Sequence, residues 1–273
     1  AAGEDDYDNA SFTVSGTRTA GTPPTLVCPV GTTVHDWDGV TWAAGTTSGS
    51  YALTAIGTMN FNIGISGGAF LNNATYGGPS PTRQNIVTGG LAPAQFSIFE
   101  IADFTSQSGA ITTTMTLPTA VPGVQFRVFD IDYAAGQFAD RLTVTGSFNG
   151  LPVTPTLTNG VSNYVIGNSA YGDATSADAS ANGNVVVTFA APVDTITITY
   201  GSHGLAPADP GQQGAAIHDI TFCRPTANLT IAKTSSVIGD PINGTTDPKA
   251  IPGATMRYCI LVTNNGSGTA TGI

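Results

Sequence analysis

The chain has 273 residues, including 34 glycines and 17 prolines, and only 10% of its residues are charged. This composition is poor in helix formers and rich in turn formers, so it predicts an all-β protein with enough chain for one large core. The formal net charge of −10 argues against nucleic acid and anionic membrane surfaces as partners, and the absence of an apolar run of about 18 residues argues against a membrane span.

Residues 1–24 form a predicted N-terminal arm. Three small residues followed by an acidic run at residues 4–8 are typical of a mature end left after signal cleavage, with the acids as a solvated tail. Residues 11–15 alternate between polar and apolar side chains, so an extended strand there would place Phe12 and Val14 on one face. The arm is therefore a candidate donor strand for assembly.

Residues 25–224 carry short alternating runs separated by Gly, Pro and Asn, a pattern typical of strands. Roughly eight to ten strands at this spacing predict a jelly-roll-like sandwich of two sheets. Residues 90–104 could hold a short helix, residues 206–213 are a predicted loop, and Pro225 marks the predicted domain boundary. The predicted strands include residues 60–65, 110–117, 124–130, 141–146, 184–189, 193–200 and 216–222.

Three cysteines suit an oxidising compartment. Cys28 and Cys223 flank the predicted sandwich, so a disulfide between them would close nearly the whole domain. Buried free thiols are the alternative. Cys259 is the odd cysteine, and we expect any partner of its thiol to lie outside this chain.

Residues 225–273 begin a predicted second domain with two strands, at residues 227–233 and 255–264. The chain ends a few residues after a turn-like segment at residues 265–268. Two or three strands cannot close a sandwich, and they leave bare edges. We therefore expect a segment from outside this chain to complete the domain, which makes assembly the first function to test.

Several motifs resemble those of a known family. Within residues 28–223 they are Cys28-Pro29, His35-Asp36-Trp37-Asp38, Phe129-Asp130-Ile131-Asp132-Tyr133 and His218-Asp219-Ile220-Thr221-Phe222-Cys223. These are similar to the N-terminal, Asp-rich sandwich domain of secreted bacterial surface proteins. Lys233, Pro252-Gly253, Tyr258 and Asn264-Asn265-Gly266 resemble the opening of the immunoglobulin-like "conserved repeat domain" that follows it. The resemblance implies a cell-surface or extracellular-matrix location and a partial immunoglobulin-like domain, and it implies no reaction.

Aspartates carry the metal chemistry that the sequence offers. Asp130 and Asp132 lie two apart at a predicted strand end, which would put both carboxylates on one face, and Asp140 follows a short loop. Hard oxygen ligands of this kind suit Ca²⁺, so we predict a calcium site at these three residues. Asp36, Asp38 and Asp219 could serve the same role elsewhere. The alternative is that these aspartates cap turns through backbone N–H groups.

Catalytic motifs are absent from the sequence. It contains no Gly-x-Ser-x-Gly, His-Glu-x-x-His or Cys-x-x-Cys, so we expect no enzyme activity. His35, His203 and His218 are scattered, and we interpret them as structural. Trp42 could stack on a sugar ring. The alternative is that Trp42 and Trp37 both pack against the sheet.

The sequence therefore predicts an extracellular, non-enzymatic subunit of a bacterial surface filament or matrix. Copies would assemble when a strand of one adds to an open sheet edge of the next. The alternative is a calcium-dependent carbohydrate-binding adhesin, with surface glycans as partners. A third hypothesis is ice or mineral binding by the alternating Thr195, Thr197 and Thr199.

Overall fold

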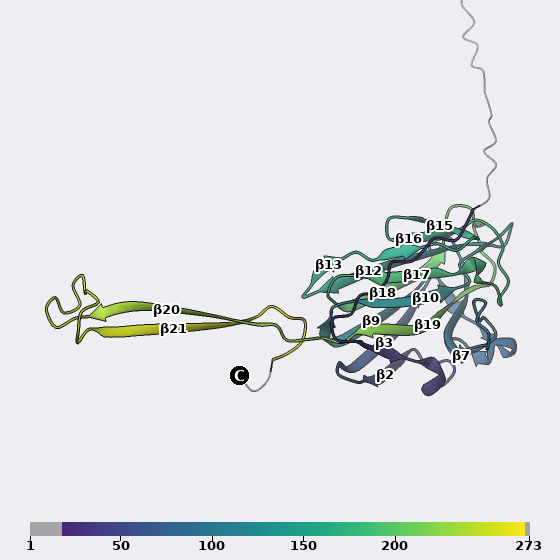
Figure 1. The fold of residues 1–273 in the computed structure, drawn as a ribbon. Helices are drawn as coiled ribbons and strands as arrows, with labels where there is room; N and C mark the ends of the chain where they lie inside the picture. Colours follow the sequence, from purple (N-terminus) through teal and green to yellow (C-terminus); the bar gives the residue numbers. More distant parts are fainter. Residues whose placement is uncertain (1–17, 271–273) are drawn as a thin grey trace, which may run out of the picture.

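The computed structural model describes residues 18–270, and every long element in that range is a β-strand. Two antiparallel sheets pack as a sandwich, and a two-stranded hairpin extends away from one end of it (Figure 1). The predicted all-β, sandwich class is thereby confirmed. None of the described helices is long and apolar enough to cross a membrane.

The first sheet has eight strands, in the order β14-β17-β10-β19-β8-β4, with β1 beside β19 and β7 beside β8. Its strands are β1 (Thr32–His35), β4 (Gly68–Phe70), β7 (Thr82–Gln84), β8 (Ser97–Phe104), β10 (Val124–Phe129), β14 (Thr156–Thr158), β17 (Val185–Phe189) and β19 (Gln213–Cys223).

The second sheet has nine strands, in the order β15-β16-β12-β18-β9-β3-β2, with β11 and β13 beside β12. Its strands are β2 (Ser48–Leu53), β3 (Gly57–Ser66), β9 (Ala110–Val121), β11 (Tyr133–Ala134), β12 (Phe138–Phe148), β13 (Leu151–Val153), β15 (Asn163–Ile166), β16 (Ser169–Gly172) and β18 (Val193–Ser202). Two short strands, β5 (Asn72–Asn73) and β6 (Gly78–Pro79), pair separately. Single helical turns occur at η1 (Trp37–Gly39), η2 (Ala74–Tyr76) and η3 (Ala181–Gly183).

The core lies between the two sheets and follows from side-chain alternation. Along β18, Ile196, Ile198 and Tyr200 are buried against the opposite sheet, while the intervening threonines face outward. Because successive side chains of a strand point to opposite faces, this pattern is what the sequence predicted for residues 193–200. The other predicted strands within the described residues are confirmed in the same way.

The helix suggested for residues 90–104 is wrong, because residues 97–104 form strand β8. Seven of its eight residues are buried, so the strand shows no alternation of polar and apolar side chains. Ile98 and Phe104 face the core between the sheets, whereas Phe99 and Ile101 pack under loops on the outer face. A continuous apolar run of this kind does not distinguish a buried strand from a helix.

One carboxyl group lies inside this core. Glu100 of β8 is 3% exposed and accepts a hydrogen bond from the hydroxyl of Thr113 on β9, in the opposite sheet. Burial raises the pKa of Glu100 from its ordinary 4.5 to about 7. The folded state therefore favours the neutral, protonated side chain at this position.

The C-terminal part is the hairpin of β20 (Leu229–Gly239) and β21 (Thr255–Asn264), which confirms both predicted strands. At its base, the hydroxyl of Thr119 in the sandwich donates to the carbonyl of Ser267 at 3.2 Å. At its tip, Asp240 accepts hydrogen bonds from the N–H groups of Asn243 and Lys249, both at 2.6 Å, and these bonds lower its pKa to about 2. The immunoglobulin-like assignment of this part stays a prediction.

Candidate functional site

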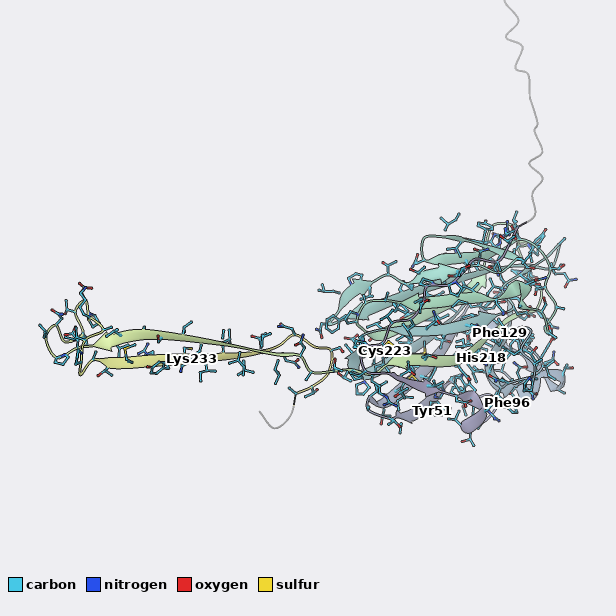
Figure 2. All side chains as sticks on the ribbon, in the orientation of Figure 1. Tyr51, Phe96, Phe129, His218, Cys223 and Lys233 are labelled. Carbon is cyan, nitrogen blue, oxygen red and sulfur yellow. A yellow bond between two sulfur atoms is a disulfide. The ribbon has the colours of Figure 1, made fainter. Side chains whose placement is uncertain are left out.

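A disulfide joins Cys28 to Cys223 across 195 residues of sequence, with the two Cα atoms 5.0 Å apart. The predicted pairing is therefore confirmed. Cys223 ends β19 at the end of the sandwich that faces the hairpin (Figure 2). The bond closes nearly the whole sandwich into one loop, which restricts the unfolded chain. Cys259 is a free, exposed thiol on β21.

The hairpin has one mainly apolar face, which also carries Lys233, Ser235 and Asn264, and one mainly polar face. Because Ile231 pairs with Val262 and Val237 with Met256, these side chains share a face with Tyr258 and Ile260. Ile231 is 72% exposed and Ile260 is 63% exposed. Figure 2 shows the side chains of the hairpin, Lys233 among them, standing clear of the sandwich. We call the set Leu229, Ile231, Val237, Met256, Tyr258, Ile260 and Val262 the apolar hairpin face.

Both outer edges of the hairpin are open within the described part of the chain. β20 and β21 form a two-stranded sheet and pair only with each other there. Each strand therefore presents a row of N–H and C=O groups without a sheet partner, which is a template for a further strand. The predicted donor residues, Phe12 and Val14, lie outside the described residues.

An acidic cavity of about 230 Å³ lies at the ends of β10 and β19. Asp130, Asp132 and Asp178 line it, together with Ser176 and Gln213. We call it the acidic cavity. Asp130 adopts a left-handed backbone with φ of 67°, so β10 ends before it and the expectation of two carboxylates on one strand face is wrong. The cavity nevertheless brings Asp130 and Asp132 together.

The electrostatics of the acidic cavity disfavour ionised carboxylates. Burial, followed by repulsion from Asp132 and Asp178, raises the pKa of Asp130 to about 8. Burial also raises the pKa of Asp132 to about 6, although a hydrogen bond from the Ser176 N–H at 2.6 Å opposes the shift. Like charges that share a buried site raise each other's pKa in this way.

Asp140 does not line the acidic cavity, contrary to the predicted ligand set. It lies within β12, where its side chain accepts hydrogen bonds from the Tyr200 hydroxyl at 2.7 Å and from the Asp132 N–H at 3.1 Å. Complete burial raises its pKa well above the ordinary value. Asp140 therefore links Tyr200 to the loop after β10 through these hydrogen bonds. Asp178, and not Asp140, lines the acidic cavity together with Asp130 and Asp132.

A second acidic group combines Asp36, Asp38 and Asp219. One carboxylate oxygen of each lies within 4.8 Å of the others. All three side chains already serve as acceptors for backbone groups: Asp36 accepts from the Asp38 N–H at 2.8 Å, Asp219 from the Trp37 N–H at 2.9 Å, and Asp38 from the Phe96 N–H at 3.4 Å. Such bonds are those of the capping alternative.

Trp42 is half-buried beside the fully buried Trp37, with ring centroids 6.1 Å apart and an edge-on geometry. Its indole N–H donates to the carbonyl of Pro81 at 3.0 Å. Trp42 and Tyr51 also line an open groove, so Trp42 combines packing with exposure on a concave surface. Trp37 lies wholly in the core.

The three histidines occupy structural positions. His35 is buried and packs against Trp37 and Tyr51, and burial lowers its pKa to about 4. His218 lies at a tilt against Phe129, with ring centroids 5.1 Å apart (Figure 2), and its Nε2–H donates a hydrogen bond to Gln95 Oε1 at 3.1 Å. His203 bonds to the carbonyl of Gly172 at 2.8 Å.

Threonines form a regular array on the outer face of the nine-stranded sheet. The three threonines of β18 at residues 195, 197 and 199 lie opposite Thr116, Thr114 and Thr112 of β9. On the other side, Thr199 and Thr197 lie opposite Thr143 and Thr145 of β12. The structure thus extends the predicted row across three strands, and binding of ice or mineral there stays a hypothesis.

Sequence reasoning missed Asp178, Gln213 and the two-faced character of the hairpin. Asp178 lies in a Ser- and Ala-rich loop without a recognisable motif, so only folding places it beside residues nearly fifty positions earlier. The alternation along residues 256–262 did carry the signal for the apolar hairpin face.

No protein-family model matches the chain, and no curated protein matches it. Among solved structures, the carbohydrate-binding module described as "Solution structure, dynamics and binding studies of CtCBM11" is similar at 11% sequence identity and a TM-score of 0.25. The similarity covers 72% of this chain and 96% of that one. A likeness at this TM-score carries no argument about the function of the present chain.

Proposed function

We propose that this protein is a structural subunit of an extracellular assembly, in which the β20–β21 hairpin of one copy accepts a strand from another copy. The observation that carries the proposal is the apolar hairpin face, whose side chains are exposed between two open strand edges. Contiguous exposed apolar surface is uncommon on soluble proteins and marks sites of association. A two-stranded ribbon alone is also marginally stable in water.

The occupant that we propose is the segment at residues 11–15 of a second copy. As an added strand, it would place Phe12 and Val14 on the apolar hairpin face, while main-chain hydrogen bonds join it to a hairpin edge. Charge also favours this pairing. Residues 1–17 contain four acids and no base, whereas residues 225–270 contain three bases (Lys233, Lys249 and Arg257) against two acids.

The first described residue and the hairpin lie at opposite sides of the sandwich. The described chain begins at Arg18, which pairs with Asp173 and lies near Tyr164 of β15, on the side of the sandwich away from the hairpin (Figure 1). A contact between two different surfaces of identical copies is head-to-tail, and it generates a filament when it does not close into a ring.

The disulfide is consistent with an oxidising, extracellular location, where such a subunit would act. The Cys28–Cys223 disulfide is of a kind that persists in secreted proteins and is rare in cytosolic ones. The low charge content and the many turn residues also suit an extracellular module. A bacterial cell surface is the location that we propose.

The donor segment is tested by truncation. Deletion of residues 1–17 should leave a folded sandwich that no longer forms polymers in electron microscopy and sedimentation. Phe12→Asp should act similarly, because an added strand would carry an unpaired charge onto the apolar hairpin face. Thr13→Asp is the matched control: it adds the same charge to the opposite face of the strand, and polymers should persist. Polymers of normal length from the truncated chain would contradict strand donation by this segment.

The alternative is a calcium-dependent carbohydrate-binding adhesin. The groove lined by Trp42 and Tyr51 favours it, because an aromatic ring on a concave, polar rim can stack on a sugar. Selective retention of the monomeric protein on a glycan array, lost in Trp42→Ala but kept in Trp42→Phe, would support this role instead.

A further inference from the structure

The acidic cavity brings together three carboxyl groups without a described basic residue beside them. No lysine or arginine is among the described residues that line it. Asp132 accepts the Ser176 N–H, and Asp178 accepts the Tyr76 hydroxyl at 3.1 Å, but no described residue donates a hydrogen bond to the Asp130 carboxylate. Buried carboxylates are normally paired with a cation or with several donors.

Neutral polar groups in the same cavity also lack partners. Gln213 is 3% exposed, and its side-chain nitrogen makes no hydrogen bond, while its Oε1 accepts the Ser202 hydroxyl at 3.0 Å. The hydroxyl oxygen of Ser176 is likewise buried without a partner. Rotating the side-chain amide of Gln213 by 180° exchanges the positions of Oε1 and Nε2. Nε2 then donates the hydrogen bond to the Ser202 hydroxyl, and Oε1 is left free as an acceptor. Unsatisfied buried groups of this kind point to a missing ligand.

We infer that the acidic cavity binds one Ca²⁺ ion through the carboxylates of Asp130, Asp132 and Asp178, whose side chains turn toward the ion on binding because their oxygens do not all lie within 4.8 Å of one another in this structure. Gln213 Oε1 and Ser176 Oγ add neutral oxygen ligands, and water completes the shell. Ca²⁺ takes about six to eight oxygen ligands in flexible geometries, and it tolerates mixed carboxylate, amide and hydroxyl donors. The set differs from the one predicted from the sequence, because Asp178 replaces Asp140.

The ion would link three segments that are distant in the sequence: the loop after β10, the loop after β16 and the first residue of β19. It would also remove the repulsion among the three carboxylates. Its role is to fix one end of the sandwich, so the site is independent of the hairpin and of the assembly proposed above.

The test titrates the chelator-treated, full-length protein with calcium chloride, with isothermal calorimetry and thermal unfolding as readouts. We expect one ion per chain and a higher Tm with calcium, because a ligand that binds only the folded state stabilises it. Asp132→Asn and Asp178→Asn should each weaken binding at least about tenfold, since each removes a charged ligand. Without calcium, Asp178→Asn should melt above the wild type, because it relieves repulsion; mere damage to the fold would lower the Tm.

Asp38→Asn is the matched control, since it removes a carboxylate from the second acidic group and should leave calcium binding unchanged. Two outcomes would overturn the inference. One is the absence of calcium binding to the wild-type protein at millimolar concentrations. The other is binding that survives in both cavity variants and is lost in Asp38→Asn, which would place the ion at Asp36, Asp38 and Asp219.

Discussion

Glu100 shows how one residue can make the stability of the sandwich depend on pH. Its carboxyl group lies between the sheets with the Thr113 hydroxyl as its hydrogen-bond donor, and its pKa is raised to about 7. In the unfolded chain the same group would titrate near its ordinary 4.5. Between these two values the folded state holds a proton that the unfolded state has released, so this group destabilises the folded state as the pH rises.

We predict that Glu100→Gln removes this dependence. The wild type should lose on the order of 3 kcal/mol relative to the variant as the pH rises from 4.5 to about 7, with little further change above that. At pH 8 the variant should therefore unfold at a higher denaturant concentration than the wild type, while the two should be similar at pH 4. Chemical denaturation across this range measures the difference, and parallel pH profiles for the two proteins would contradict it.

At the scale of the element, alternation identified strands that have one buried face and failed for the strand that has two. Residues 193–200 and 255–264 alternate visibly, and both form strands. β8 is buried on both faces, so its sequence lacks the alternation that identifies a strand. Only part of the acidic cavity could be predicted from the sequence. Asp130 and Asp132 are close to each other in the sequence, whereas Asp178 and Gln213 come near them only through the sheet topology.

The hairpin offers a matched pair of positions for testing its apolar face. Ile260 and Leu261 are adjacent, apolar and exposed to similar extents, 63% and 62%, but they point to opposite faces. We predict that Ile260→Asp abolishes polymer formation, because it removes an apolar side chain that the added strand would cover and leaves a carboxylate beside Lys233, whose burial would be costly. Leu261→Asp should leave polymers in electron microscopy near the wild-type amount. Equal effects of the two substitutions would mean that the apolar hairpin face has no special role.

At the scale of the whole molecule, we assign stability to the sandwich and association to the hairpin. The sandwich is closed by the Cys28–Cys223 disulfide and by continuous packing between two sheets, so its core is covered on both sides. The hairpin has no such layer over its apolar face among the described residues. In the assembly that we propose, this division would give each copy a stable body and an open element for its neighbour, which is the central claim of the proposed function.

Cysteine cross-linking tests that claim most directly, because it reports which strand lies beside the hairpin and which face it presents. Cys259 lies on the mainly polar face of β21, opposite Thr234 of β20. New cysteines at Ser11, Thr13 and Ser15 would face the same side if Phe12 and Val14 face the other. Each is combined either with native Cys259, to probe the β21 edge, or with Thr234→Cys and Cys259→Ser, to probe the β20 edge.

We predict that at least one of these positions gives a ladder of covalently joined copies after mild oxidation, seen on a non-reducing gel. A disulfide requires Cα atoms within about 7 Å, so the ladder should appear for one hairpin edge and not the other. Val14→Cys, on the opposite face, should give none in either background. No ladder at any of the three positions with either edge, or equal ladders from Val14→Cys, would contradict strand donation by the N-terminal segment.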